Sequence, residues 1–109
     1  MTKITIIKSK NGEYKKVTCK GHAGYADAGS DIVCCAISML VLNTINSLEI
    51  LTGAPMEVSS DEESGFLVCT FTGNLDKSSV LLLDSMVLGL ETVVSEYGKK
   101  YLKLKFKEV

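Results

Sequence analysis

The side chains of this sequence best suited to chemistry are a thiol and an imidazole, those of Cys34 and His22. His22 is the only histidine of the chain. A thiol attacks strongly only as its thiolate, and a neighbouring imidazole can accept the thiol proton and later return it to a leaving amine. With Cys34 as nucleophile and His22 as base, the pair can carry out the acid and base steps of amide cleavage.

Cys34 lies where the sequence predicts the first turn of a helix. Ser30 or Asp31 is a suitable N-cap, and Gly53 predicts the helix end near residue 52. The unpaired N–H groups and the dipole of a helix N-terminus favour negative charge, so they favour a thiolate at this position. We expect Asp31 to act first as a cap or first-turn carboxylate, and orientation of His22 is its second candidate role.

Two further residues are candidates to support this site. Ser38 lies one turn after Cys34 on the same helix face, where it can line the site or bond back to the helix. Gly29 belongs to the stretch 21–31, which holds three glycines and two aspartates and therefore predicts a loop. We expect this loop to gate the site, because its glycines give it backbone freedom and a bound peptide could draw it open.

The other cysteines have simpler interpretations. Cys19, Cys35 and Cys69 are expected to be small buried side chains. Because no segment resembles a signal peptide, we expect reduced thiols rather than a disulfide framework. A zinc site would need Cys34 and Cys35 to converge with His22 and one more thiolate. Adjacent helical residues project about 100° apart, so this site is disfavoured and neither metal nor cofactor is expected.

The alternating segments of the chain predict two β-hairpins and a final strand. Asn11-Gly12 is a typical hairpin turn, and an acidic turn joins the second pair of strands. The last strand alternates apolar residues with lysines, a pattern that protects a sheet edge. These segments lie at residues 3–9, 14–20, 58–60, 66–72 and 101–107.

Two helices are predicted between these strands. The first lacks charge from Ile32 to Leu48, and we expect it to be buried on most sides. The second follows the helical period from Val80 to Tyr97, with Asn74 or Asp76 as its cap and Gly98 closing it. The order β-β-α-β-β-α-β predicts one α+β domain over residues 1–109, a mostly antiparallel sheet covered by two helices.

Composition limits the partners of the chain. With 12 Lys+Arg against 13 Asp+Glu, the net charge of -1 provides no global attraction to nucleic acid or anionic lipid, and we expect no direct nucleic-acid partner. The apolar segment 32–51 carries several polar residues, so it makes a poor membrane span and no membrane partner is expected. We expect a cytoplasmic protein. We also expect a homodimer, because a small domain alone buries a smaller fraction of its surface than a large one.

The run GHAGYADAGSDIVCCAIS, residues 21–38, resembles the signature of the ribosomal-processing cysteine protease family called Prp. In that pattern G-H-A precedes a glycine-containing loop and G-x-D-I-V-C-A-A-x-S. The departure is Cys35, where family members usually carry alanine, and we interpret its sulfur as packing. The matching residues are Gly21, His22, Ala23, Gly29, Asp31, Ile32, Val33, Cys34, Ala36 and Ser38.

The resemblance implies a homodimeric cysteine endopeptidase with His22 as base and Cys34 as nucleophile. It also implies a substrate, the large-subunit ribosomal protein L-twenty-seven, from which an N-terminal extension is removed. Two other classes stay open on the residues alone. One is a non-catalytic ribosome-associated binding or assembly factor, and the other is a redox protein that uses Cys34 and Cys35.

Overall fold

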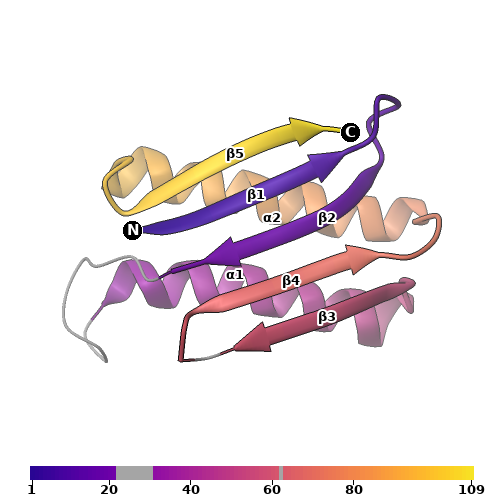
Figure 1. The fold of residues 1–109 in the computed structure, drawn as a ribbon, viewed down its shortest axis with the longest axis horizontal. Coiled ribbons are helices and arrows are strands. Elements are labelled where there is room, and N and C mark those ends of the chain that lie inside the picture. The colour runs from indigo at the N-terminus through magenta and orange to yellow at the C-terminus, as the bar shows by residue number, and fades with distance from the viewer. Residues whose placement is uncertain (22–30, 62) are drawn as a thin grey trace.

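The structure is a computed structural model that describes residues 1–21, 31–61 and 63–109. Its elements follow the predicted order β-β-α-β-β-α-β, which confirms the α+β class (Figure 1). The elements are β1 (Thr2–Lys8), β2 (Tyr14–Lys20), α1 (Ile32–Ser47), β3 (Met56–Asp61), β4 (Phe66–Phe71), α2 (Lys77–Tyr97) and β5 (Leu102–Glu108).

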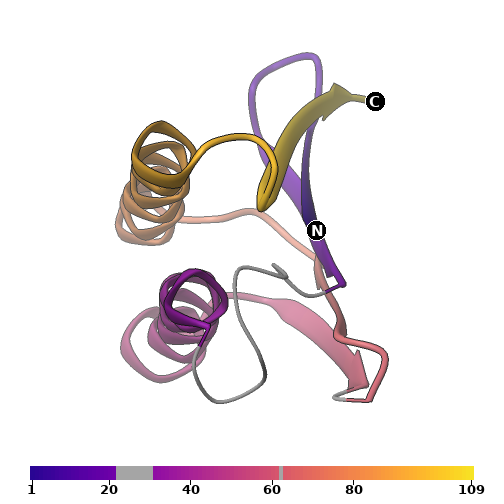
Figure 2. The same ribbon diagram turned by 90° about the vertical axis from the view of Figure 1, so that its left-hand side faces the viewer.

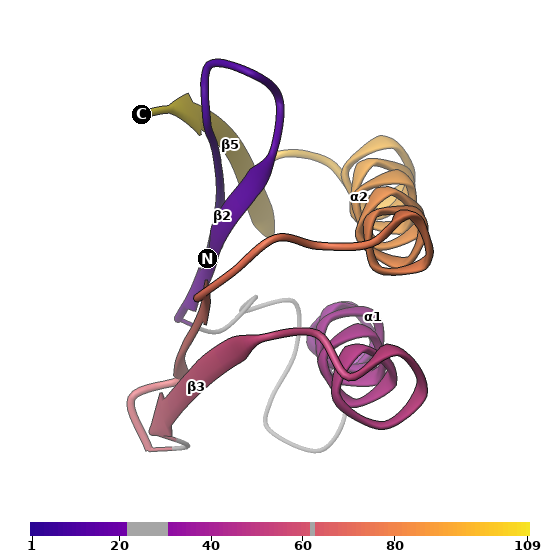
Figure 3. The same cartoon turned by 90° about the vertical axis from the view of Figure 1, so that its right-hand side faces the viewer.

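The strands form one five-stranded sheet in the order β3-β4-β2-β1-β5. The β1–β2, β2–β4 and β3–β4 pairs are antiparallel, and β5 pairs with β1 in parallel. β4 and β5 run in the same direction at separate places in the sheet, and α2 provides the long crossover connection between them. Both helices lie on the same face of the sheet, so the opposite face is uncovered (Figures 2 and 3).

The first hairpin has the turn that its sequence predicts. Gly12 has a φ of 82°, a left-handed conformation that suits glycine. The register between β1 and β2 shifts once, between Ile7 and Lys8. The second hairpin, β3–β4, is also present, and its first strand begins at Met56, two residues before the predicted start.

Local signals also place the ends of α1. Asp31 is the N-cap, and its side chain accepts a hydrogen bond from the backbone of Cys34. After Ser47 the helix widens into a π-helical turn, Leu48–Thr52. It ends at Gly53, whose φ is 63° and whose N–H donates to the carbonyl of Leu48. The predicted end near residue 52 is therefore confirmed.

The expected burial of α1 on most sides is wrong. Only one stripe of the helix faces the sheet, while Ile32, Met39 and Leu42 on its other sides are exposed. The physical reason is the single helix layer, in which each helix has one covered face and solvent on the opposite face. The buried residues of α1 are Val33, Ile37, Val41, Thr44 and Ile45.

Ile32–Thr52 and Lys77–Tyr97 are both long and apolar enough, by length and composition, to cross a bilayer. Core helices of soluble proteins pass the same test, so this finding alone does not identify a membrane protein. Each helix here also contributes a buried stripe to the core.

Helix α2, which the helical period predicts, packs against β5 on the covered face of the sheet. Asp76 is its N-cap and accepts a hydrogen bond from the N–H of Ser79 at 2.8 Å. Leu83, Met86 and Leu90 are buried in one cluster with residues of the sheet. Gly98 ends the helix and donates its N–H to the carbonyl of Val94.

Candidate active site

Cys34 is the third residue of α1, in a first turn that the N-cap holds closed. Asp31 Oδ1 accepts a hydrogen bond from the Cys34 N–H at 2.8 Å, and the Asp31 carbonyl accepts one from the Cys35 N–H at 3.0 Å. These bonds fix the backbone that carries the thiol. Asp31 therefore positions Cys34 directly, in the capping role that the sequence assigned to it first.

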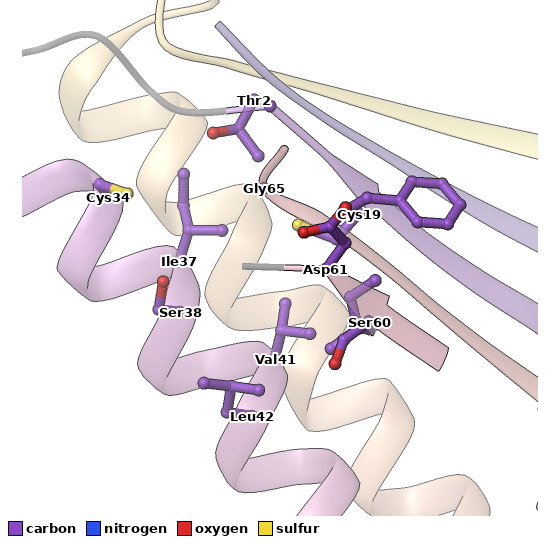
Figure 4. A pocket seen from close by; sticks show the side chains of 13 residues that line it. Thr2, Cys19, Cys34, Ile37, Ser38, Val41, Leu42, Ser60, Asp61 and Gly65 are labelled. Carbon is purple, nitrogen blue, oxygen red and sulfur yellow. The ribbon is translucent and has the colours of Figure 1, made fainter. Parts of the chain in front are cut away.

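A cleft of about 270 Å³ lies between α1 and the strands beside it (Figure 4). The wall on α1 comes from successive turns of the helix, and the opposite wall comes from the ends of β1 and β2 and from the second hairpin. Ser38 lies on the helical wall, one turn after Cys34. The lining residues are Thr2, Cys19, Gly21, Cys34, Ile37, Ser38, Val41, Leu42, Ser60, Asp61, Gly65, Phe66 and Leu67.

Two glycines bring the strand side of this cleft together. The Gly21 N–H donates to the Gly65 carbonyl at 2.9 Å, which joins the end of β2 to the turn of the second hairpin. Gly21 has a φ of 89°, and a Cβ at this position would lie 2.7 Å from the carbonyl oxygen of Met1. Only glycine fits both the conformation and the space, so Gly21 has a structural role that its place in the sequence motif did not reveal.

Cys35 does not have the packing role expected for it. Its side chain is exposed, whereas Cys34 is half-buried and lines the cleft. Neighbouring residues of a helix project about 100° apart, so only one of the two thiols can face the strands. The structure therefore distinguishes the two cysteines by orientation, although the sequence places them side by side.

Of the two other cysteines, Cys69 is buried as expected and Cys19 is not. Cys69 is buried as predicted; burial raises the pKa of its thiol to about 11, and its Sγ lies 3.6 Å from Met56 Sδ. Cys19 is only half-buried and lines the cleft together with Cys34. Burial first, and then the negative charge of a Cys34 thiolate, raise the pKa of the Cys19 thiol.

All four cysteines belong to the described part of the chain, and none forms a disulfide. Outside residues 22–30 and 62, no three His, Cys, Asp or Glu side chains come close enough to hold a metal ion. His22, Gly29 and the predicted gating loop lie outside the described residues, so their roles stay predictions.

The sequence reasoning missed the strand side of the cleft. Cys19 comes from β2, whereas Ser60 and Leu67 come from the second hairpin, which is distant from β2 along the chain. A signal existed for Cys19, which lies two residues before Gly21 at the end of a predicted strand. The other two required knowledge that β4 pairs with β2, which no local pattern supplies.

Comparison with known proteins gives consistent matches along the chain. A sequence model of the family described as cysteine protease Prp matches residues 1–103. The ribosomal processing cysteine protease Prp of Bacillus subtilis is 28% identical over 101 residues, which cover 89% of this chain and 90% of that protein. The protein of the same name from Staphylococcus aureus is 28% identical over 108 residues, covering 98% of this chain and 100% of that protein.

Solved structures match the whole fold. The crystal structure of the essential ribosomal processing protease Prp from Staphylococcus aureus, in complex with a covalently linked product peptide, superposes with a TM-score of 0.92 at 25% identity. The match covers 98% of this chain and 100% of that one. A crystal structure from Streptococcus mutans superposes with a TM-score of 0.85 at 28% identity, covering 100% of this chain and 96% of the other.

Proposed function

Because this chain belongs to the Prp family of cysteine proteases, we propose that it removes the N-terminal extension of the large-subunit ribosomal protein L-twenty-seven, with Cys34 as nucleophile and His22 as base. The observation that carries this proposal is the position of Cys34, in the capped first turn of α1 on the wall of an apolar cleft. The names of its relatives support a ribosomal substrate, and the crystallised product peptide supports peptide binding at this fold.

The proposed reaction proceeds by acyl transfer. The Cys34 thiol gives its proton to the His22 imidazole, and the sulfur attacks the carbonyl carbon of the scissile peptide bond. The C–N bond then breaks, the leaving amine takes the proton from the imidazolium, and a thioester remains. Water, deprotonated by the same imidazole, hydrolyses the thioester and restores the thiol.

The first turn of α1 offers donors for the oxyanion of this reaction. The Cys34 N–H already donates to Asp31 Oδ1 at 2.8 Å. The N–H groups of Ile32 and Val33, the first two residues of the helix, have no acceptor within it. We assign oxyanion stabilisation to these two groups, because they belong to the same turn as the sulfur and to the positive end of the helix dipole.

The cleft suits an extended peptide with apolar side chains. Ile37 and Val41 on α1 and Leu67 on β4 give it apolar walls. Its volume of about 270 Å³ is slightly below the roughly 300–1,000 Å³ of sites for drug-sized ligands. It can therefore hold one or two side chains beside the scissile bond, while the rest of the peptide lies outside.

We further propose that the protein acts in the cytoplasm as a homodimer. Four free thiols fit a reducing compartment. Exposed leucines on the outer side of α2, Leu81 and Leu88, and exposed Ile50 and Leu51 after α1 provide an apolar surface of the kind that subunit interfaces cover. Light scattering after size-exclusion chromatography should give the dimer mass for the wild type and a monomer mass for Leu88→Glu.

The test of the function is cleavage of a peptide that carries the ribosomal extension, followed by mass spectrometry. Cys34→Ala should abolish cleavage because it removes the attacking sulfur, and the matched variant Cys35→Ala should retain most of it. His22→Ala should lower turnover by about 100-fold or more, the range for loss of a general base. Cleavage by Cys34→Ala, or no cleavage by wild type with reduced Cys34, would refute the proposal.

A further inference from the structure

The face of the sheet that the helices leave open carries a concentration of positive charge. The viewer of Figure 1 looks onto this face, in front of both helices. The strand register places Lys3 between Lys20 on β2 and Lys103 on β5. Their neighbours along the strands, Ile4 and Leu102, are buried in the helix-covered core, so the alternation of side chains directs these three lysines to the open face.

The same alternation brings three more lysines to this face. Lys105 pairs with Thr5, and Ile7 pairs with Lys16 on one side and Lys107 on the other. Half of the 12 basic residues therefore occupy one face of three adjacent strands. The open-face lysines are Lys3, Lys16, Lys20, Lys103, Lys105 and Lys107.

Carboxylates do not balance this charge locally. The only acidic residue of β1, β2 and β5 is Glu108, which pairs with Lys8 and falls on the alternation that faces the helices. The nearest acidic positions on the open alternation are Glu57 and Asp61, on β3 at the far edge of the sheet. The net charge of -1 thus conceals a strong separation of charge between surfaces.

This arrangement of lysines does not stabilise the folded chain. Like charges directly opposite one another on a sheet are destabilising, and Lys3 is opposed on both sides. Lysines protect a sheet edge from aggregation, which explains those on the edge strand β5. Lys3, Lys16 and Lys20 lie on the interior strands β1 and β2, where that explanation does not apply.

We propose that the open face of β2, β1 and β5 binds the phosphate backbone of RNA. Strands lie about 4.8 Å apart and alternate residues about 6.7 Å apart, so the six ammonium groups form a compact array that can meet several successive phosphates. Threonine hydroxyls at Thr5 and Thr18 lie between them and can donate to phosphate or ribose oxygens. Phe66, half-buried and paired with Lys20, also lines the cleft, and its ring can stack on one base where the open face reaches the cleft.

The same features argue against the other polyanions. A membrane surface site combines basic residues with large apolar side chains that enter the bilayer. The apolar residue among these lysines, Ile7, is half-buried. The hydroxyls and the aromatic ring match RNA better than they match an acidic peptide. Apart from stacking on the Phe66 ring, which accepts any base, the contacts are to the backbone, so binding is independent of sequence.

The salt dependence of binding gives a quantitative expectation. Each phosphate neutralised on a single strand contributes about 0.7 to the slope of log K against log salt. Six contacts give a slope of about 4, so affinity should fall roughly 300-fold between about 50 and about 200 mM salt. Loss of three contacts should reduce this fall to roughly 20-fold.

The experiment is fluorescence anisotropy of a labelled uridine oligonucleotide of about 30 nucleotides, titrated with protein at several salt concentrations. The test variant changes Lys16, Lys105 and Lys107 to Gln, because these three lie away from the cleft end of the strands. It should weaken binding and reduce the salt slope by about 2. Peptide cleavage should be unchanged, so failure of this inference is distinguishable from failure of the protease proposal.

A matched control changes Lys10, Lys77 and Lys99 to Gln, which removes the same charge from exposed positions outside the three strands. It should keep the wild-type slope. Equal losses in the two variants would refute a specific face, because net charge alone would then explain binding. The inference is also overturned if the wild type fails to bind the RNA at low salt, or binds phosphatidylserine vesicles or poly-glutamate at least as tightly.

Discussion

Replacement of Gly21 by alanine tests how the cleft is built. Gly21 has a φ of 89°, and its N–H is donated to the Gly65 carbonyl. An alanine Cβ would lie 2.7 Å from the carbonyl oxygen of Met1, which is closer than van der Waals contact allows. Because Thr2 is held to Tyr101 by a 3.0 Å backbone bond, the start of β1 cannot move away without loss of that bond.

Gly12 provides the matched control for the magnitude. It has nearly the same φ, 82°, but a Cβ there would meet nothing within 4 Å. Gly12→Ala should therefore cost only the left-handed conformation, about 1 kcal/mol. Gly21→Ala should cost that term and an overpacking term of about 1–3 kcal/mol, so about 2–4 kcal/mol in total. For 109 residues, Tm should fall by roughly 4 °C per kcal/mol.

Thermal and urea unfolding followed by circular dichroism measure these losses. Gly21→Ala should also lower kcat/KM on the extension peptide, because the displaced Thr2 lines the cleft, whereas Gly12→Ala should not. Equal destabilisation of the two variants would refute the reasoning. It would mean that the close approach to the Met1 carbonyl is relieved at little cost.

Three further outcomes are expected. Asp31→Ala should lower stability by about 1 kcal/mol, the usual loss for an N-cap. Asp31→Asn should retain most of the wild-type stability. A fall in Tm without a change in turnover would show that the cap does not position Cys34. Burial, and then the hydrogen bond to Asp84, raise the pKa of Tyr14 above its ordinary value. The folded state therefore holds this proton longer than the unfolded state, so stability should fall as pH rises above about 10. Unfolding curves of Tyr14→Phe should lack this loss, and an unchanged pH dependence would contradict the assignment. Burial raises the pKa of the Cys69 thiol to about 11. Iodoacetamide near neutral pH should therefore label Cys34 and spare Cys69 in the native protein, which peptide mass spectrometry would show. Early labelling of Cys69 would contradict its burial.

Sequence alone predicted the elements because their signals are local. The Asp31 cap bonds an N–H three residues away, and Gly12 and Gly53 adopt conformations that favour glycine within single turns. The same reasoning placed Cys34 in the first turn of a helix. These interactions join residues a few positions apart, so a short stretch of sequence is enough to predict them.

The predictions from sequence are wrong where burial depends on which other element packs against a residue. A charge-free α1 suggested burial on most sides, but a single helix layer covers one stripe and leaves Met39 and Leu42 exposed. Cys35 was expected to pack, yet the rotation of one helical residue turns it away from the strands and leaves it exposed. An apolar side chain can be buried at little cost, but the packing of distant elements decides whether it is buried or exposed.

Only the tertiary structure assembled the surfaces around the thiol. The pairing of β2 with β4 brings Cys19 and Leu67 opposite α1 and closes the cleft. The parallel pairing of β1 with β5 gathers lysines from both ends of the chain on one open face. Such contacts depend on strand order and register, which are set by the burial of one face of every strand at once, so no local pattern in the sequence specifies them.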